Sequence, residues 1–252
     1  MEIWWCSSWG GPAAPAASGI CTRPPALVAA GYRVCTFDNR GIAPSGESLG
    51  GITMPDMVAD TAGLIEHLGG GPAHVIGTSM GARVAQELTL ARPDLVRKAV
   101  FLAGHARMDH FQQVLTEGER QLFDSGVALP AKYRAAVTAV MNLSPATLAD
   151  DHSARDWMDI FEFTGGATSP GVRAQLGMDR AFDRRGGAYK SIMRPCLSVA
   201  FADDRMIPPY LSREVADCIA TALYEEIPDA GHYGYLERPE AVNKVLIDFL
   251  AK

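Results

Sequence analysis

The stretch AHVIGTSMG, residues 73–81, decides how this chain is expected to fold. It opens with an apolar run typical of a buried strand, and the helix-forming segment 82–91 follows it. Gly77 and Gly81 flank Ser79 in a Gly-x-Ser-x-Gly pattern, because only small residues let the strand and helix backbones come so close. Such a strand-to-helix turn strains the serine backbone and exposes its hydroxyl group. The stretch therefore predicts a nucleophilic serine at the end of a strand.

A nucleophilic serine needs two partners, and both types of residue follow in the expected order of acid and then histidine. Asp203 and Asp204 come directly after an expected strand, Cys196–Phe201. His232 follows another expected strand, Leu223–Ile227, in the sequence Pro-Asp-Ala-Gly-His. A neutral imidazole can take the serine proton, and a carboxylate fixes the tautomer of that imidazole. The pattern therefore predicts a Ser-Asp-His triad.

The rest of the chain alternates apolar strand-like runs with amphipathic helical segments. We expect strands near 3–6, 34–38, 74–77, 99–103, 196–201 and 223–227, and helices over 55–68, 82–91 and 239–251. Between His105 and about Lys190 no strand is evident, and helices are expected over 109–125, 131–141, 153–163 and 170–183. Strands that alternate with helices predict an α/β fold with a parallel sheet and right-handed crossovers.

Together these motifs resemble the α/β-hydrolase fold family, and more narrowly its cofactor-free haloperoxidase, esterase and enol-lactonase branch. The chain is similar to actinobacterial proteins described as non-haem peroxidases. The matching stretches are residues 29–33, 37–41, 57–61, 77–81, 201–204 with 208–210, 228–232 and 237–240. The resemblance implies a mostly parallel sheet with helices on both faces, formed by residues 1–104 and 191–252. It also implies an inserted helical cap at residues 105–190, and we expect the family's first two strands to be missing.

The resemblance also assigns roles to the triad candidates. Asp204 has the spacing to Pro208 that the family's acid has, so Asp203 would be a solvated or capping neighbour. A rarer arrangement in the family places the acid after the strand that precedes the cap, where Asp109 is the nearest aspartate. His232 occupies the family's position for the base. The resemblance implies no cofactor, and no spacing among the six histidines suggests a metal site.

Two backbone N–H groups should stabilise the negative oxygen that forms during acyl transfer. The resemblance assigns one to Met80 and the second to Trp9, in the loop after an early strand. Here Ser7 and Ser8 replace the family's usual His-Gly pair, and residues 11–25 are rich in proline and alanine. Divergence, a late start and a reading-frame disturbance in the gene are three open explanations for this unusual beginning.

Several residues are candidates for the substrate pocket or for its support. His105 follows the strand before the cap, Tyr233 follows the base, and the cap offers large apolar side chains. These cap side chains are Trp157, Met158, Phe161, Phe163 and Met178, and the alternative is that they form the cap's own core. Asp38, Arg40 and Gly41 are expected to organise their own loop rather than to take part in catalysis.

Composition narrows the class of protein. The chain has 252 residues, 48% of them hydrophobic, which suffices for one large domain with a cap. Its net charge of −6, with no basic stripe, argues against a nucleic-acid partner. The five scattered cysteines form no Cys-x-x-Cys pair. No apolar run is long enough to span a membrane. Residues 1–9 lack the basic start of a signal peptide. We therefore expect a cytoplasmic protein that acts on a small molecule. The composition is compatible with a homo-oligomer.

These observations lead to a first hypothesis and two alternatives. The first is a serine hydrolase that cleaves a small, largely apolar ester, lactone or thioester through an acyl-serine intermediate. Peroxide in place of water would give a peracid, and hence a perhydrolase or haloperoxidase side activity. The first alternative is a C–C bond hydrolase or a natural-product tailoring enzyme. The second, of another class, is a non-hydrolytic ligand-binding or cyclase-like protein on the same fold.

Overall fold

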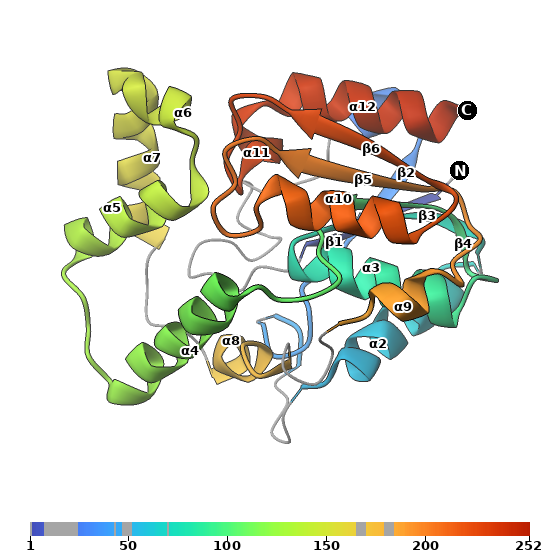
Figure 1. Cartoon of the computed structure of the whole chain (residues 1–252), viewed down its shortest axis with the longest axis horizontal. Coiled ribbons are helices and arrows are strands. Elements are labelled where there is room, and N and C mark those ends of the chain that lie inside the picture. The colour runs from blue at the N-terminus through green and yellow to red at the C-terminus, as the bar shows by residue number, and fades with distance from the viewer. Residues whose placement is uncertain are drawn as a thin grey trace.

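A six-stranded parallel sheet forms the centre of the molecule (Figure 1). The computed structural model describes residues 2–7, 25–42, 44–46, 52–69, 71–164, 170–178 and 184–252, the first of these ranges as backbone only. The strand order is β2-β1-β3-β4-β5-β6. The strands are β1 (Glu2–Ser7), β2 (Arg33–Thr36), β3 (Ala73–Thr78), β4 (Val96–Leu102), β5 (Cys196–Phe201) and β6 (Ala222–Ile227).

The order in which strands are added to the sheet reverses between β1 and β3. β2 is added on one side of β1, and β3 and the later strands are added on its other side. In open parallel sheets, ligands bind outside the carboxyl ends of the strands at such a reversal. Ser79 follows β3 directly, so the fold places it at this point.

Helices cover both faces of the sheet. The helices outside the β4–β5 connection are α1 (Pro25–Ala29), α2 (Met54–His67), α3 (Met80–Ala91), α10 (Pro209–Cys218), α11 (Gly234–Glu237) and α12 (Pro239–Ala251). On one face, Leu27 of α1 and Leu246 of α12 join a buried apolar cluster. On the other face, Ile65 of α2, Leu88 of α3 and Val215 of α10 join a second cluster. β3 and β5 are buried along their whole length, as expected for a sheet covered on both sides.

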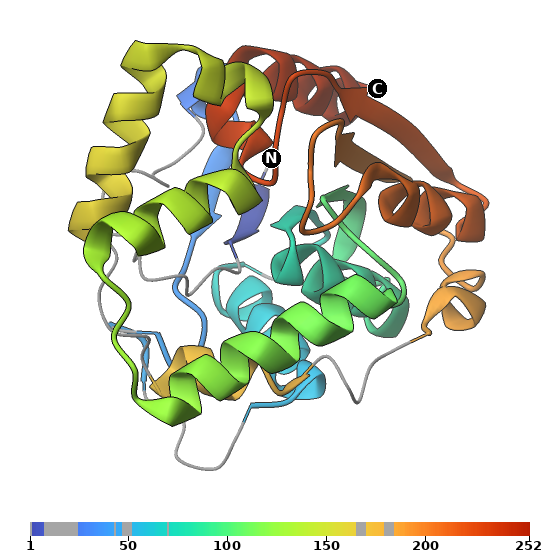
Figure 2. The same ribbon diagram turned by 60° about the vertical axis from the view of Figure 1, so that its left-hand side comes forward.

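A run of helices connects β4 to β5. These helices are α4 (His110–Ser125), α5 (Ala131–Asn142), α6 (Pro145–Ala149), α7 (Asp151–Thr164), α8 (Pro170–Gln175) and α9 (Gly186–Tyr189). The arrows of β5 and β6 point toward the side on which α5, α6 and α7 lie (Figure 1), and Figure 2 shows α4 crossing in front of the core. α9 differs from the others, because its Tyr189 is fully buried in the apolar cluster beneath α3 and α10. Residues 105–190 as one cap unit remain a prediction.

The predicted fold class is confirmed, and the expected strands are present with shifted ends. β4, for example, begins at Val96 rather than Ala99. The expected helix over 170–183 is wrong in its extent, because α8 ends at Gln175 and a turn follows. Gly177 lies in that turn, and glycine is a poor helix former.

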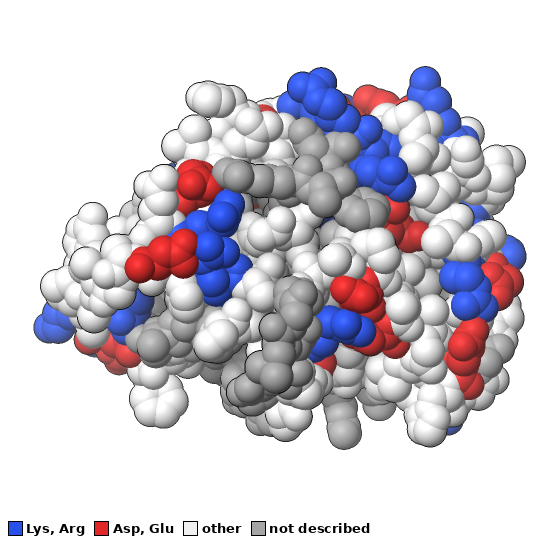
Figure 3. Space-filling view, turned by 90° about the horizontal axis from the view of Figure 1, so that it is seen from below, with Lys and Arg blue, Asp and Glu red and all other residues white. Residues whose placement is uncertain are grey.

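The face of the molecule seen in Figure 3 is mixed in charge. Figure 3 shows basic and acidic side chains next to one another in small groups on a largely uncharged face. In the described part of the chain no helix is long and apolar enough to cross a membrane. The same residues contain no group of three or more His, Cys, Asp or Glu side chains that could hold a metal ion.

Candidate active site

Ser79 occupies a strained turn between β3 and α3. Its backbone angles are φ 55° and ψ −118°, a conformation that residues with a side chain rarely adopt. The Ser79 N–H donates to the carbonyl oxygen of Leu102 at 2.9 Å, which ties the turn to β4. A Cβ atom at Gly77 would lie 2.0 Å from the carbonyl oxygen of Gly81, so only glycine fits there. The strained turn predicted from the sequence is therefore present.

Asp204 and His232 come from the loops after β5 and β6, at the same edge of the sheet as Ser79. His232 Nε2 lies 3.1 Å from Ser79 Oγ, and His232 Nδ1 lies 2.8 Å from Asp204 Oδ2. The other oxygen of Asp204, Oδ1, accepts the N–H of Ile207 at 2.8 Å. The Asp204 and His232 side chains are 0% and 3% exposed. The structure thus brings the three predicted residues into one hydrogen-bonded chain.

The two other aspartates considered for the acid have different contacts. The Asp109 side chain accepts the Gln112 N–H at 2.7 Å and caps the start of α4. It also accepts a hydrogen bond from the Tyr210 hydroxyl, which raises the pKa of Tyr210 to about 12. Asp203 contacts the loop before His232 through its backbone, because its N–H donates to the carbonyl oxygen of Ala230 at 2.8 Å. Of the three aspartates, Asp204 is the one bonded to the histidine.

The start of α3 offers a place for negative charge beside Ser79. Met80 is the first residue of this helix, so its N–H has no acceptor within the helix. The partial positive charge of a helix N-terminus also favours a developing oxyanion. Trp9, the second expected donor, lies outside the described residues. The oxyanion roles of both residues remain predictions.

An aromatic cluster joins the cap helices to the residue after the histidine. Trp157 and Phe161 of α7 have ring centroids 5.3 Å apart, and each ring lies 6.2 Å from that of Tyr233. Phe161 and Tyr233 are buried against Leu143 at the end of α5. The three aromatic residues thus pack α7 against the end of α5 and the loop after β6, and their contact with a substrate remains a prediction.

The other pocket candidates are distributed differently. His105 is 5% exposed, and burial lowers its pKa well below the usual range, with Arg83 and His232 adding to the effect. Its imidazole is therefore neutral at ordinary pH. Met178 packs with Met54 and Met57 of α2 instead of the aromatic cluster. The expectation that Phe163 lines the roof or core of the cap is wrong. Its side chain is 93% exposed.

Sequence comparison places this geometry in a known family. The family model for the alpha/beta hydrolase fold matches residues 10–239. The chain belongs to the alpha/beta hydrolase fold family. The Mycobacterium tuberculosis protein named "Putative non-heme bromoperoxidase BpoC" is 48% identical over 227 residues, which cover 90% of this chain and 86% of that protein. Resemblance to the non-haem haloperoxidase branch of the family is thereby confirmed.

The solved structure of BpoC and one further relative support a hydrolase-type enzyme of this family. The crystal structure of BpoC from M. tuberculosis superposes with a TM-score of 0.91 at 43% identity, covering 99% of this chain and 91% of that one. A protein of Azorhizobium caulinodans named "Putative carbamate hydrolase RutD" is 29% identical over 225 residues, 88% of this chain and 82% of that protein. The chain is thus similar to members that carry bromoperoxidase and hydrolase names.

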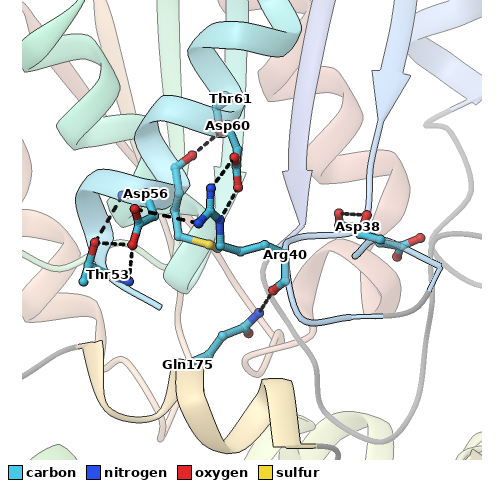
Figure 4. Close-up of polar contacts among 9 residues, drawn as sticks. Asp38, Arg40, Thr53, Asp56, Asp60, Thr61 and Gln175 are labelled. Carbon is cyan, nitrogen blue, oxygen red and sulfur yellow. Dashed lines mark hydrogen bonds and ion pairs between the residues drawn. The ribbon is translucent and has the colours of Figure 1, made fainter. Parts of the chain in front are cut away.

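The loop at Arg40 contacts α2 and α8 (Figure 4). The Arg40 guanidinium donates two hydrogen bonds of 2.5 Å to Asp60 and lies 3.7 Å from Asp56. Its carbonyl oxygen accepts the Gln175 side-chain amide at 3.2 Å. A Cβ atom at Gly171 would clash with the backbone of the same loop. Arg40 therefore links α2, its own loop and α8.

An ionic group centred on the buried Glu87 of α3 was not anticipated from the sequence. Glu87 of α3 accepts two hydrogen bonds from Arg185, at 2.7 and 2.9 Å, and one from the Tyr189 hydroxyl at 2.9 Å. Burial raises the pKa of Tyr189. Arg83, one turn nearer Ser79, is 1% exposed. The sequence did contain a pattern that points to this group. Ser79, Arg83 and Glu87 follow one another at four-residue spacing, and the rest of the helix is mostly apolar.

Proposed function

We propose that this chain is a serine hydrolase that cleaves a small, largely apolar ester, lactone or thioester through an acyl-serine intermediate. The observation that carries the proposal is the buried hydrogen-bonded chain from Asp204 through His232 to Ser79, with the serine on a strained turn. Membership of the alpha/beta hydrolase fold family supports the same reaction class.

In the first step Ser79 Oγ attacks the carbonyl carbon of the substrate. His232 Nε2 takes the hydroxyl proton, and the hydrogen bond to Asp204 stabilises the imidazolium that forms. The carbonyl oxygen becomes negative beside the N-terminus of α3, where Met80 N–H would donate to it. As the C–O or C–S bond breaks, His232 returns the proton to the leaving alcohol or thiol.

In the second step water attacks the acyl-serine, and His232 again takes the proton. The product acid leaves when the bond to Ser79 Oγ breaks and the serine regains its proton. An apolar acyl group is proposed because Trp157, Phe161 and Tyr233 form an apolar cluster next to His232.

The bromoperoxidase name of BpoC supports a finer proposal, a perhydrolase side activity. Hydrogen peroxide in place of water would release a peracid from the acyl-serine. The peracid would then oxidise bromide to hypobromous acid and revert to the carboxylic acid. This bromide oxidation should require both Ser79 and a carboxylic acid or ester.

Hydrolysis of p-nitrophenyl acetate and butyrate tests the main proposal. We expect Ser79→Ala to lower kcat by on the order of 10⁶-fold, because the nucleophile is removed. Ser191→Ala, at an exposed position between α9 and β5, is the control and should leave kcat unchanged. Equal rates for the wild type and Ser79→Ala would overturn the proposal and favour a non-hydrolytic binding protein.

A further inference from the structure

The C-terminal end of α5 contacts both loops that carry the partners of Ser79. On the acid side, Arg205 directly follows Asp204 in sequence. Its Nη1 donates to the carbonyl oxygens of Val140 at 2.7 Å and Leu143 at 3.4 Å. A cation at the carbonyl end of a helix is favourable because it satisfies free carbonyl groups and opposes their partial negative charge. The acid loop is therefore anchored to the end of α5.

On the base side, the loop around His232 is pressed against the same end of α5. The Tyr233 N–H donates to the carbonyl oxygen of Asn142 at 3.0 Å. A Cβ atom at Gly231 would lie 2.6 Å from that same oxygen and 2.6 Å from the carbonyl carbon of Leu143. Only glycine allows this approach, so the residue before His232 is a contact point between backbones.

Glu237 connects these two segments through one carboxylate. Its Oε1 accepts the N–H of Ser144, which caps α6 directly after α5, at 2.8 Å. Its Oε2 accepts the N–H of Gly231 at 2.7 Å. Hydrogen bonds to an ionised acceptor are roughly twice as strong as neutral ones. Glu237 thus holds the residue before His232 and the α5–α6 junction at a fixed distance from each other.

We propose that Glu237 is a positioning residue, which sets His232 against Ser79 by tying the base loop to the α5–α6 junction. It contacts no reacting atom and acts through the backbone of Gly231. The same tie makes the geometry of the triad depend on the position of α5. The inference rests on the proposed serine hydrolase reaction.

Misplacement of a catalytic group by about 1 Å can cost on the order of 10²-fold in rate. We therefore expect Glu237→Ala to lower kcat by roughly 10²-fold and to change KM little, because the apolar cap cluster stays in place. Glu237→Gln keeps one acceptor oxygen and should fall between the wild type and Glu237→Ala. Glu240→Gln is the matched control, since Glu240 is an exposed acid on the neighbouring turn, and should behave like the wild type.

The decisive measurement is kcat on p-nitrophenyl butyrate per active serine, titrated with a fluorophosphonate, for the wild type and these three variants. A moderate loss of kcat in Glu237→Gln and a larger loss in Glu237→Ala would support the positioning role. A lower melting temperature with unchanged kcat per active serine would show a merely structural role and overturn the proposal. A rise in KM alone would also overturn it.

Proton NMR keeps this test independent of turnover. The His232 Nδ1–H that bonds to Asp204 should give a downfield signal in the wild type, and Glu237→Ala should weaken or shift it while Glu240→Gln preserves it. If the wild type proves inactive on every ester, the proposed function fails, but this signal still decides whether Glu237 positions His232. An identical signal in Glu237→Ala would contradict the positioning role.

Discussion

The sheet edge that carries the triad residues and the cap helices α4 and α5 are held in place by different means. At the sheet edge, Asp204 and His232 are 0% and 3% exposed and take part in defined hydrogen bonds. In α4, by contrast, Gln112 is the one buried residue. Large apolar side chains on α4 and α5 are 40–60% exposed, namely Phe111, Val114, Leu122, Tyr133, Val137 and Val140.

We expect this difference to separate residues that determine the rate of the chemical step from residues that determine substrate preference. Short loops fixed by backbone contacts hold reacting groups precisely, and small displacements there cost rate. Away from the C-terminal end of α5, the expected cap contacts the rest through an aromatic cluster and through part-exposed ion pairs such as Arg107–Glu214, so we expect it to shift at lower cost. We therefore expect substitutions at the sheet edge to change kcat, and substitutions in the cap to change stability and substrate preference.

Among the substitutions that compare these two regions, the largest effect is expected at the acid. Asp204→Asn should lower kcat by about 10⁴-fold, because an amide of the same shape no longer selects the histidine tautomer or stabilises the imidazolium. Asp203→Asn, at the preceding residue, is the control and should retain nearly full activity. Steady-state hydrolysis of p-nitrophenyl butyrate measures both. Similar losses of kcat in the two variants would contradict the assignment of Asp204 rather than Asp203 as the acid.

A smaller effect is expected in the cap, where two phenylalanines on α7 provide a matched pair. Phe161 is 4% exposed and Phe163 is 93% exposed. Phe161→Ala should lower the free energy of unfolding by about 3–5 kcal/mol, while Phe163→Ala should change it by less than about 0.5 kcal/mol. Chemical denaturation measures both values.

The same pair tests where substrate choice lies. Phe161→Ala should favour bulkier p-nitrophenyl esters relative to the acetate, with kcat per active serine on the acetate close to wild type. A loss of kcat equal to that of Asp204→Asn would contradict the division between the sheet edge and the cap.

The smallest effect concerns the ion pair between α4 and α8. Asp124 accepts two hydrogen bonds from Arg173, at 2.8 and 2.7 Å, and these lower the pKa of Asp124. A lowered pKa means that the stabilisation is present above the carboxyl group's ordinary pKa and is lost as the pH falls through the lower value in the folded protein.

Asp124→Asn should therefore lower the melting temperature slightly at neutral pH. The difference from the wild type should vanish in acid and shrink in high salt, because both side chains reach the solvent. Thermal melts across pH give the answer. A difference that persists unchanged in acid would show that the ion pair is not its cause.

Features that depend on local sequence could be predicted, and features that depend on distant segments could not. The Ser79 turn follows from two glycines and an apolar strand, and the loops of Asp204 and His232 follow from strands of clear apolar character. The end of α8 at Gln175 was missed, because the helical pattern continues past Gly177 while the chain turns.

The role proposed for Glu237 shows the limit more clearly. Its carboxylate contacts Ser144, which is 93 residues away in sequence. No periodicity or spacing connects the two, because the contact depends on where α5 ends against the base loop. The buried group at Glu87 lies between these cases, since its spacing from Ser79 was visible but its partner Arg185 was not.

The central claim is that Ser79 is an activated nucleophile, and labelling with a fluorophosphonate probe tests it without any assumption about the substrate. Only an activated serine reacts quickly, so the folded wild type should be labelled once, at Ser79 as located by peptide mass spectrometry. Ser79→Ala and heat-denatured wild type should not react, and Asp204→Asn should react far more slowly. A wild type that stays unlabelled, or a Ser79→Ala variant labelled at the same rate, would contradict the claim.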